Sequence, residues 1–401
     1  MKKVSILMIM LLMVNGATAQ WIIQNSGTSN SLYGVYFTDT NTGYAVGQNG
    51  TILKTINGGN EWTALTSGTT RSLISVYFTD INTGYTVGDS GIILKTTNAG
   101  VDWAFQYSGT INILSSINFI NTNTGFIVGS DVFLKTLNGG AIWTAQTSIT
   151  SGSLHTFCFT DTNTFYTAGN TGKLYRTSDG GNTWLAIQPT IYPTNIFNSV
   201  FFTDANTGYL AGSEWSFAFI YKTMDGGTTW ESSFDIQGQD FTPAIKSVYF
   251  IDADNGYAAG MGLAYHNIIK TTNAGIDWDQ QFCGTDNNLN SIFFTDVNTG
   301  YAVGDIGTIL KTTNGGIEGV NDPHPLINHL KIYPNPTSDN ITIKSMTEGH
   351  LTILNLDGQQ IQQLEITVPT TTIDVSTLQS GIYIVKFVGK KGVQVGRFVK
   401  E

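Results

Sequence analysis

Short apolar runs alternate with polar turns along most of the chain, and the same order returns about every 40 residues from Trp21 to Gly316. The runs are rich in β-branched and aromatic residues, and Gly, Asn, Asp and Thr fill the turns between them. This pattern predicts strands rather than helices. In the first copy the predicted strands are Leu32 to Phe37, Gly43 to Gly47, Thr51 to Thr55 and a strand that starts at Trp62.

A repeat of four short strands at this period is typical of the blades of a β-propeller. The sequence therefore predicts an all-β protein with a seven-bladed propeller. The seven copies begin near Leu32, Leu73, Leu114, Leu154, Phe197, Lys246 and Asn290.

The tryptophan that opens the fourth strand is missing from the seventh copy, which ends at Gly316, but Trp21 precedes the first copy. We infer that the strand from Trp21 completes the last blade, because an open edge strand would otherwise remain. That pairing would close the ring without a covalent bond.

A turn of the form Asp-x-Asn-Thr-Gly, first seen at Asp39 to Gly43, lies between strands one and two. We expect Asp and Asn to support the turn through side-chain hydrogen bonds, and Gly43 to relieve a positive φ. A calcium loop is the alternative, but the bidentate Glu that such loops place later in the sequence is missing. The turn recurs at Asp80, Asp161, Asp204 and Asp296.

A second motif, Thr177 to Trp184 with the sequence TSDGGNTW, lies between strands three and four and resembles the Asp-box. Thr223 to Trp230 matches it, and other copies carry Asn in place of Asp. The resemblance implies a structural role, in which the acidic or amide group caps the turn and the Trp packs between blades. The residues concerned are Asp179, Gly181, Trp184, Asp225, Gly227 and Trp230.

Together with the TGYAVG and GTILKTTNGG segments, these motifs resemble the propellers of the photosystem II assembly factor family and related BNR-type proteins. The resemblance covers Trp21 to Gly316 and implies the fold. That family is known for an Arg-rich patch, whereas this propeller contains only Arg71 and Arg176. An assembly-factor-like role therefore stays an alternative.

The N-terminus, Met1 to Ala19, has two lysines, an apolar run and an A-x-A ending, so we predict a signal peptide cleaved between Ala19 and Gln20. A membrane anchor is the alternative, but the apolar run is shorter than the roughly 20 residues that span a bilayer. No later segment could span one. The net charge of -10 argues against a nucleic-acid partner.

After Gly316 the repeat ends, and a Pro-containing linker of residues 317–328 precedes a new pattern at 329–401. Seven strand-like runs predict a small Ig-like β-sandwich. With residues 1–19 as signal peptide and 20–316 as propeller, this completes the predicted domains. The runs are Lys331 to Tyr333, Ile341 to Lys344, Leu351 to Leu356, Ile361 to Ile366, Thr372 to Val375, Ile382 to Phe387 and Val393 to Val399.

Several ordered motifs in this region resemble the type A sorting domain of type IX secretion; an ordinary Ig-like adhesion domain is the alternative. The resemblance implies passage through the periplasm, transfer by the type IX machinery, and a secreted or surface location, with possible attachment to lipopolysaccharide. The motif residues are Tyr333, Pro334, Asn335, Pro336, Gly381, Tyr383 and Lys400.

The sequence favours no catalytic site. Two propeller arginines cannot form the triad of a sialidase. His155 and His266 lack a nucleophile elbow, and Cys158 and Cys283, which we expect to be unpaired, form no metal motif. We therefore expect no cofactor and no metal. A hydrolase that uses a carboxylate pair remains open; candidates are Glu61, Asp89, Asp102, Glu214, Asp240 and Asp305.

The repeats differ most in blades five and six. Lys54 follows Gly47 by seven positions, whereas ten positions separate Gly212 from Lys222 and Gly260 from Lys270. Because strands alternate in direction, these longer loops share one face with the blade-to-blade connections. We predict that their aromatic side chains bind an unknown glycan or protein partner, with loop packing as the alternative. The candidate binding residues are Trp215, Phe217, Phe219, Tyr265 and His266.

Overall fold

The computed structural model describes most of the chain after the N-terminal segment. The predicted cleavage site at Ala19 and Gln20 lies outside the described residues, as do Tyr265, His266, Pro334 and Asn335. The described residues are 21–146, 152–170, 172–189, 195–215, 217–237, 243–262, 267–316, 328–329, 331–333, 336–344, 348–355, 359–368, 370–389 and 392–401.

The chain divides into two compact units, one containing residues 18–319 and the other containing 320–401. In the first unit the described residues form seven antiparallel four-stranded sheets, so the all-β prediction is confirmed. Sheets one to four consist of β2 (Leu32–Phe37), β3 (Gly43–Gly47), β4 (Ile52–Thr55) and β5 (Thr63–Leu65); β6 (Leu73–Phe78), β7 (Gly84–Gly88), β8 (Ile93–Thr96) and β9 (Ala104–Gln106); β10 (Leu114–Phe119), β11 (Gly125–Gly129), β12 (Val132–Thr136) and β13 (Thr144–Ala145); and β14 (Leu154–Phe159), β15 (Phe165–Gly169), β16 (Leu174–Thr177) and β17 (Leu185–Ile187). Sheets five to seven consist of β18 (Ile196–Phe202), β19 (Gly208–Glu214), β20 (Phe217–Thr223) and β21 (Glu231–Gln237); β22 (Ala244–Phe250), β23 (Gly256–Met261), β24 (Ile268–Thr271) and β25 (Asp279–Gln281); and β26 (Leu289–Phe294), β27 (Gly300–Gly304), β28 (Ile309–Thr312) and β1 (Ile22–Gln24).

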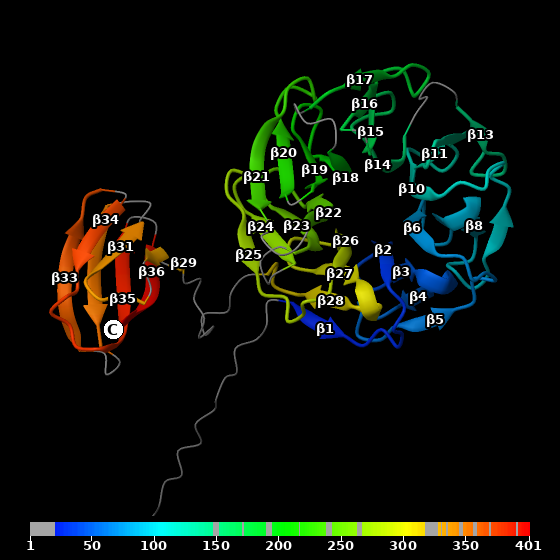
Figure 1. Cartoon of the computed structure of the whole chain (residues 1–401). Helices are drawn as coiled ribbons and strands as arrows, with labels where there is room; N and C mark the ends of the chain where they lie inside the picture. Colours follow the sequence, from blue (N-terminus) through cyan, green and yellow to red (C-terminus); the bar gives the residue numbers. More distant parts are fainter. Residues whose placement is uncertain are drawn as a thin grey trace, which may run out of the picture. The chain divides into compact units, whose positions relative to one another are not determined.

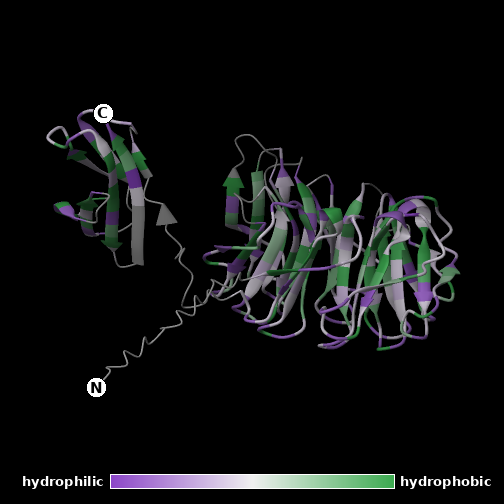
Figure 2. Ribbon diagram, turned by 90° about the horizontal axis from the view of Figure 1, so that it is seen from below, coloured by the Kyte–Doolittle hydropathy of each residue, from purple (hydrophilic) through white to green (hydrophobic). Residues whose placement is uncertain are grey.

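These sheets lie around a common centre with their first strands innermost (Figure 1). The last sheet meets the first, because the Asn290 side-chain amide donates to the carbonyl oxygen of Leu32 at 2.9 Å. Figure 2 shows that the strands carry most of the hydrophobic residues. The core consists of apolar clusters between neighbouring sheets, such as the cluster that joins Leu32 and Trp62 to Tyr301.

Strand β1 forms the fourth strand of the seventh sheet, as the position of Trp21 predicts. Ile22 pairs with Lys311 and Gln24 with Ile309 in an antiparallel ladder. Trp21 is fully buried and packs edge-on against Phe294, with ring centroids 5.8 Å apart. The two ends of the repeat region are therefore joined by backbone hydrogen bonds and by aromatic packing.

The glycine at the start of the second strand does not relieve a positive φ, contrary to the prediction, but serves another purpose. Gly43 does not have a positive φ. A Cβ atom there would lie only 2.4 Å from the Phe37 ring, so the glycine makes room for that ring. The expected turn support by Asp39 is confirmed, because its Oδ1 accepts from the backbone N–H groups of Asn41 and Thr42 at 2.7 and 2.8 Å.

Neighbouring sheets are linked at their Asp-box turns by a tyrosine and a lysine. Tyr44 Oη and Lys54 Nζ of sheet one both donate to the carbonyl oxygen of Ala99 in sheet two, each at 2.8 Å. Tyr301 of sheet seven reaches Gly58 of sheet one in the same way, at 2.8 Å. The link is weaker between sheets three and four, where Phe126 replaces the tyrosine and only Lys135 donates.

The second unit contains a five-stranded sheet, in the order β29-β36-β35-β32-β33, and a three-stranded sheet, β30-β31-β34. All seven predicted runs form strands, and β29 adds a short parallel strand beside β36. Among the described residues, no helix is long and apolar enough to cross a membrane. The strands are β29 (Asn328–His329), β30 (Lys331–Tyr333), β31 (Asn340–Lys344), β32 (Gly349–Leu354), β33 (Gln360–Ile366), β34 (Thr370–Asp374), β35 (Gly381–Gly389) and β36 (Gly392–Lys400).

Candidate functional site

The Asp-box residues form structural turns in sheets four and five. The Asp179 carboxylate accepts from the backbone N–H groups of Asn182 and Thr183, at 3.0 and 2.9 Å, and from the Thr183 hydroxyl. These bonds, with the Thr183 hydroxyl first, lower the pKa of Asp179 to about 2. Gly181 has a φ of 87° and accepts from the indole N–H of Trp184 at 3.2 Å.

The second Asp-box repeats this geometry. Asp225 accepts from the backbone and side chain of Thr229, at 2.8 and 2.7 Å, and these bonds lower its pKa to about 2. Trp230 donates to Gly227, which has a φ of 82°. All of these polar groups are used within the turn, which leaves the motif no chemistry of its own.

The predicted aromatic patch is only partly exposed. Trp215 joins β19 to β20, is 82% exposed and has a φ of 46°. Phe217 is 42% exposed, but Phe219 is only 4% exposed and packs edge-on against Phe197. Phe219 therefore belongs to the core, in agreement with the loop-packing alternative. Tyr265 and His266 cannot be placed, since they lie outside the described residues.

The sorting-motif residues lie on the strands of the second unit. Tyr333 ends β30 and is 49% exposed, and Gly381 starts β35. Tyr383 is buried, stacks on Phe398 with ring centroids 5.4 Å apart, and donates to the Gln379 carbonyl oxygen. Lys400 is buried and Pro336 is exposed.

The sequence analysis missed a bulge at the same position of every first strand. In sheet one the register shifts between Leu32 and Gly34, which leaves Tyr33 unpaired in the ladder, and all seven first strands repeat the shift. All seven bulge residues are half-buried. They are Tyr33, Ile74, Ser115, His155, Asn198, Lys246 and Asn290.

All seven bulge residues line a central cavity of about 590 Å³, and Ser115, Ile74 and Tyr33 are among them. Since Leu32 pairs with Gly47, the end of the second strand, the bulges lie at the end of each sheet that carries the loop between strands two and three. We call this end of the ring the loop face and the cavity the channel mouth. The lining bulge residues are Tyr33, Ile74, Ser115, His155, Asn198, Lys246 and Asn290, with Asp89 beside them.

Charged groups at the channel mouth influence one another. Burial lowers the pKa of Lys246, an effect that nearby Asp305 opposes. Burial also lowers the pKa of His155. The positive charge of Lys246 lowers it too, and a side-chain hydrogen bond with Asn198 opposes the decrease. Burial raises the pKa of Tyr33, and the carboxylates of Asp305 and Asp89 raise it further.

Below the bulges, two further layers narrow the centre of the ring. Small residues follow each bulge, and the hydroxyls of four of them link neighbouring sheets, as when Ser199 accepts from the backbone N–H of Val248 at 3.1 Å. Aromatic rings form the next layer over five consecutive sheets, with neighbouring ring centroids 5.2 to 5.5 Å apart. Those rings are Phe201, Tyr249, Phe293, Tyr36 and Tyr77.

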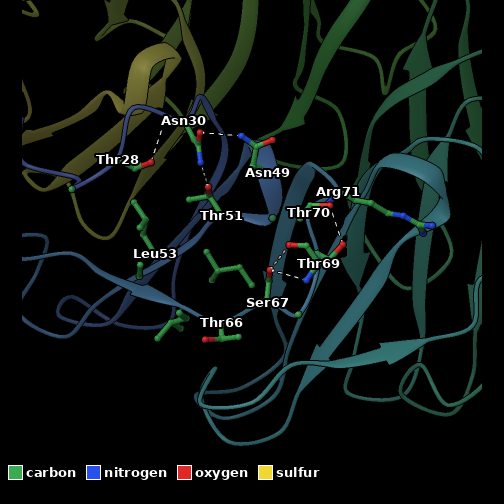
Figure 3. A pocket seen from close by; sticks show the side chains of 16 residues that line it. Thr28, Asn30, Asn49, Thr51, Leu53, Thr66, Ser67, Thr69, Thr70 and Arg71 are labelled. Carbon is green, nitrogen blue, oxygen red and sulfur yellow. Dashed lines mark hydrogen bonds between the residues drawn. The ribbon is translucent and has the colours of Figure 1, made fainter.

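A groove of about 790 Å³ lies between the turns of sheets seven, one and two (Figure 3). Asn30 donates to the Thr51 hydroxyl at 2.9 Å and accepts from Asn49, and the Ser67 hydroxyl donates to the Thr69 carbonyl oxygen. Its polar groups therefore largely bond to one another. The groove does confirm that connections and second-to-third-strand loops share one face.

The turn that connects sheets six and seven explains the position of Cys283. The Cys283 thiol donates to the Thr285 carbonyl oxygen at 3.3 Å, as the Ser67 hydroxyl does to Thr69. Cys283 therefore replaces the serine of a repeated Ser-Gly-Thr turn. Both Cys158 and Cys283 are free, as expected.

The candidate catalytic carboxylates are scattered. Glu61 and Asp102 lie in Asp-box turns, where their backbone N–H groups are bound by Asn57 and Asn98. Asp89 lines the channel mouth, and Asp305 accepts from the side chains of Asn288 and Asn290 at 3.0 and 3.2 Å. Glu214 ends β19, and Asp240 lies outside the described residues. No group of three or more His, Cys, Asp or Glu in the described ranges could hold a metal ion.

Two families match parts of the chain. Residues 331–401 match the secretion system C-terminal sorting domain, and residues 13–109 match photosynthesis system II assembly factor YCF48. No curated protein matches the chain.

Solved structures with a similar fold include propellers of different roles. YCF48 bound to D1 peptide is 17% identical, with a TM-score of 0.62 over 74% of this chain and 96% of that one. The GH74 enzyme of Niastella koreensis is 15% identical, with a TM-score of 0.59 over 94% and 74%. PorZ, a surface component of the type IX secretion system of Porphyromonas gingivalis, is 14% identical, with a TM-score of 0.55 over 93% and 59%. At these identities the likeness shows the fold.

These matches and the repeated sheets define the class: a BNR-type β-propeller followed by a type IX secretion sorting domain. The protein is exported by that system and is secreted or displayed on the cell surface.

Proposed function

We propose that the exported propeller is a binding module that recognises an extracellular or surface partner, a glycan or a protein, at its loop face. The observation that carries this proposal is the variation at the seven bulges. The residue before each bulge is always a large apolar one, and the residue after it is always Gly, Ser or Thr. The bulge itself holds Tyr, Ile, Ser, His, Asn, Lys and Asn.

Packing does not account for this variation, because the backbone around each bulge repeats from sheet to sheet. A residue selected for packing would repeat as its neighbours do, whereas residues that contact a ligand without sevenfold symmetry must differ. Trp215 adds an exposed aromatic side chain on a hairpin of the same face, and such residues are common in binding surfaces.

The state of the carboxyl groups also favours binding over hydrolysis. A glycosidase needs a general acid with a raised pKa. In the described part of the propeller, the aspartates whose pKa departs from the ordinary value all have it lowered, as in Asp39, Asp161 and Asp204. Their turn hydrogen bonds keep them ionised.

We further infer that the seven sheets are the blades of a closed seven-bladed propeller and that the second unit is an Ig-like sandwich. Domain limits at residues 19, 316 and 328, the signal cleavage and the surface attachment to lipopolysaccharide are part of the same proposal. It is supported by the join between sheets one and seven and by the two sheets of the C-terminal unit.

The proposal is tested by a screen of the purified protein against surface polysaccharides and surface proteins. Trp215→Ala, alone and with Tyr265→Ala, should weaken binding by about 30-fold or more, the usual loss for a central aromatic contact, without a change in melting temperature. Met224→Ala is the matched control, because Met224 is 73% exposed in the Asp-box turn of the same sheet.

Two outcomes would count against the proposal. A lower melting temperature of Trp215→Ala with unchanged affinity would show that Trp215 is a packing residue. Release of reducing ends from a polysaccharide would show that the propeller is a hydrolase.

A further inference from the structure

Three polar groups at the channel mouth have no hydrogen-bond partner among the described residues. They are the ammonium group of Lys246, the carboxylate of Asp89 and the hydroxyl of Tyr33, and all three line the cavity of about 590 Å³. Half-buried groups of this kind lose part of their hydration and regain it through a bound ligand. The channel mouth therefore offers both donors and acceptors to a ligand.

The charges are separated around the ring. The donor side consists of His155, Asn198 and Lys246 on the consecutive sheets four, five and six. The acidic side is centred on Tyr33 of sheet one. Its hydroxyl interacts electrostatically with the carboxylates of Asp305 in sheet seven and Asp89 in sheet two. In a ring of seven sheets, sheet one lies opposite sheets four and five.

The acidic side and the donor side are neighbours where sheet seven adjoins sheet six, but no hydrogen bond in the described structure joins their charged groups there. Asp305 attracts Lys246 but is already bound by Asn288 and Asn290, and no hydrogen bond joins it to the ammonium group in the described structure. On the other boundary, Ile74 and Ser115 separate Asp89 from His155. The pocket is thus bipolar, with its positive and negative groups held apart.

The pocket has the dimensions of a small-molecule site, since such sites enclose roughly 300 to 1,000 Å³. Its walls are well ordered, because the bulge residues lie within paired first strands and Asp89 begins the short 3-10 helix η2 (Asp89–Gly91). The layer of aromatic rings lies farther along the same first strands, at Tyr36 and Tyr249. A polymer that threads through the ring would have to pass those rings.

We propose that the channel mouth binds a zwitterion, a small molecule or head group that carries an ammonium group and an oxyanion a few bonds apart. Lys246 and His155 receive the oxyanion, and Asp89 and Tyr33 receive the ammonium group. Charge-assisted hydrogen bonds and the face of the tyrosine ring favour these pairings. The inference rests on the proposed function, because it names a ligand class for the same face.

Calorimetry on the mature full-length protein tests the proposal with whole ligands and their halves. The zwitterions are O-phosphoethanolamine and β-alanine, and the halves are ethanolamine and inorganic phosphate. We expect each zwitterion to bind at least about tenfold more tightly than either half, because one charge-assisted hydrogen bond alone is worth about that factor.

Two variants should separate the two ends of the ligand. Lys246→Met should weaken O-phosphoethanolamine and phosphate by about tenfold and leave ethanolamine unchanged, whereas Asp89→Asn should weaken ethanolamine and leave phosphate unchanged. Lys173→Met and Asp286→Asn are matched controls, because both residues are exposed and neither lines the cavity. Melting temperatures confirm that each variant folds.

The source of the zwitterion is distinguished by vesicles. Binding to phosphatidylethanolamine vesicles but not to phosphatidylglycerol vesicles indicates a lipid head group, and binding to the free molecules alone indicates a soluble ligand. Halves that bind as tightly as the whole ligands, variants that weaken both halves alike, or no binding of either zwitterion would each overturn the proposal. If the zwitterion proposal fails but the protein still binds a partner through Trp215, the proposed function stands. If the protein binds a zwitterion but no glycan or protein partner, the channel-mouth proposal stands and the proposed function fails.

Discussion

Single residues in the Asp-box turn control the contact between two sheets. In the turn of sheet two, Ala99 follows Asn98. Its carbonyl oxygen accepts hydrogen bonds from the Tyr44 hydroxyl and the Lys54 ammonium group of sheet one. Ala99 has a φ of 56°, a left-handed conformation that is costly for residues with a Cβ atom. Sheets three and four have glycine at this position, Gly139 and Gly180.

We therefore expect Ala99→Gly to stabilise the propeller. Relief of the left-handed strain outweighs the extra freedom of glycine in the unfolded chain, so the free energy of unfolding should rise by about 0.5 to 1 kcal/mol. Calorimetric or denaturant unfolding measures the change. The reverse substitution Gly139→Ala is the matched control and should destabilise by about 1 kcal/mol, because Gly139 has a φ of 62°. Equal stability of all three proteins would show that the turn relaxes around the alanine.

At the scale of elements, one three-residue strand joins the two ends of the repeat region. Strand β1 pairs only with β28, so its contribution comes from three ladder positions and from the buried indole of Trp21. The exposed side chains of Ile22 and Ile23 contribute little burial. Most of the stabilisation therefore depends on Trp21.

Deletion of Trp21 to Gly27 should destabilise the whole propeller. It exposes the edge of β28 and removes a buried tryptophan, a loss that alone costs about 3 to 5 kcal/mol. Thermal unfolding of the truncated protein should begin at clearly lower temperature than that of a chain that starts at Gln20. Ile23→Ser is the control for a change in the same strand without loss of the indole. Unchanged unfolding of the truncation would contradict ring closure by β1.

At the scale of the whole molecule, the propeller sheets and the sorting domain belong to separate units. The propeller sheets and the C-terminal sheets each have their own core, with Leu32 and Trp62 in one cluster and Ile353 and Phe398 in another. The sorting-domain match covers only the second unit.

Removal of Lys331 to Glu401 should therefore leave the propeller folded but hold it in the periplasm. Cell fractionation and immunoblotting locate the truncated protein, and its melting transition shows whether the propeller is intact. Trp215→Ala in the full chain is the control, since it should alter binding but not export. Truncated protein in the medium would show that another segment directs export.

Much of the fold could be predicted from the sequence because the determinants are local and repeated. Apolar runs of strand length gave the strands of both units, and the displaced Trp21 gave the pairing of β1 with β28. The turn at Asp39 was also predictable, because an aspartate reaches backbone N–H groups only two and three residues ahead.

The candidate site was not predictable in the same way. The variation at Tyr33, His155 and Lys246 is visible in the aligned copies, but a strict alternation of inward and outward residues does not reveal a bulge. Loop length led to Trp215, which is exposed, and also to Phe219, which is buried. Loop length reports the amount of extra chain and not the direction of its side chains.

The sequence by itself determined the strands, the turns, the repeat and the sorting domain, because each depends on residues close together in the chain. Only the tertiary structure decided which residues meet at the centre. Lys246 and Asp89 are far apart in sequence, yet both line the channel mouth because the sheets lie around a common centre (Figure 1). The same closure explains the bond between Tyr301 of sheet seven and Gly58 of sheet one. Contacts of this kind depend on distances between sheets, which a local pattern does not contain.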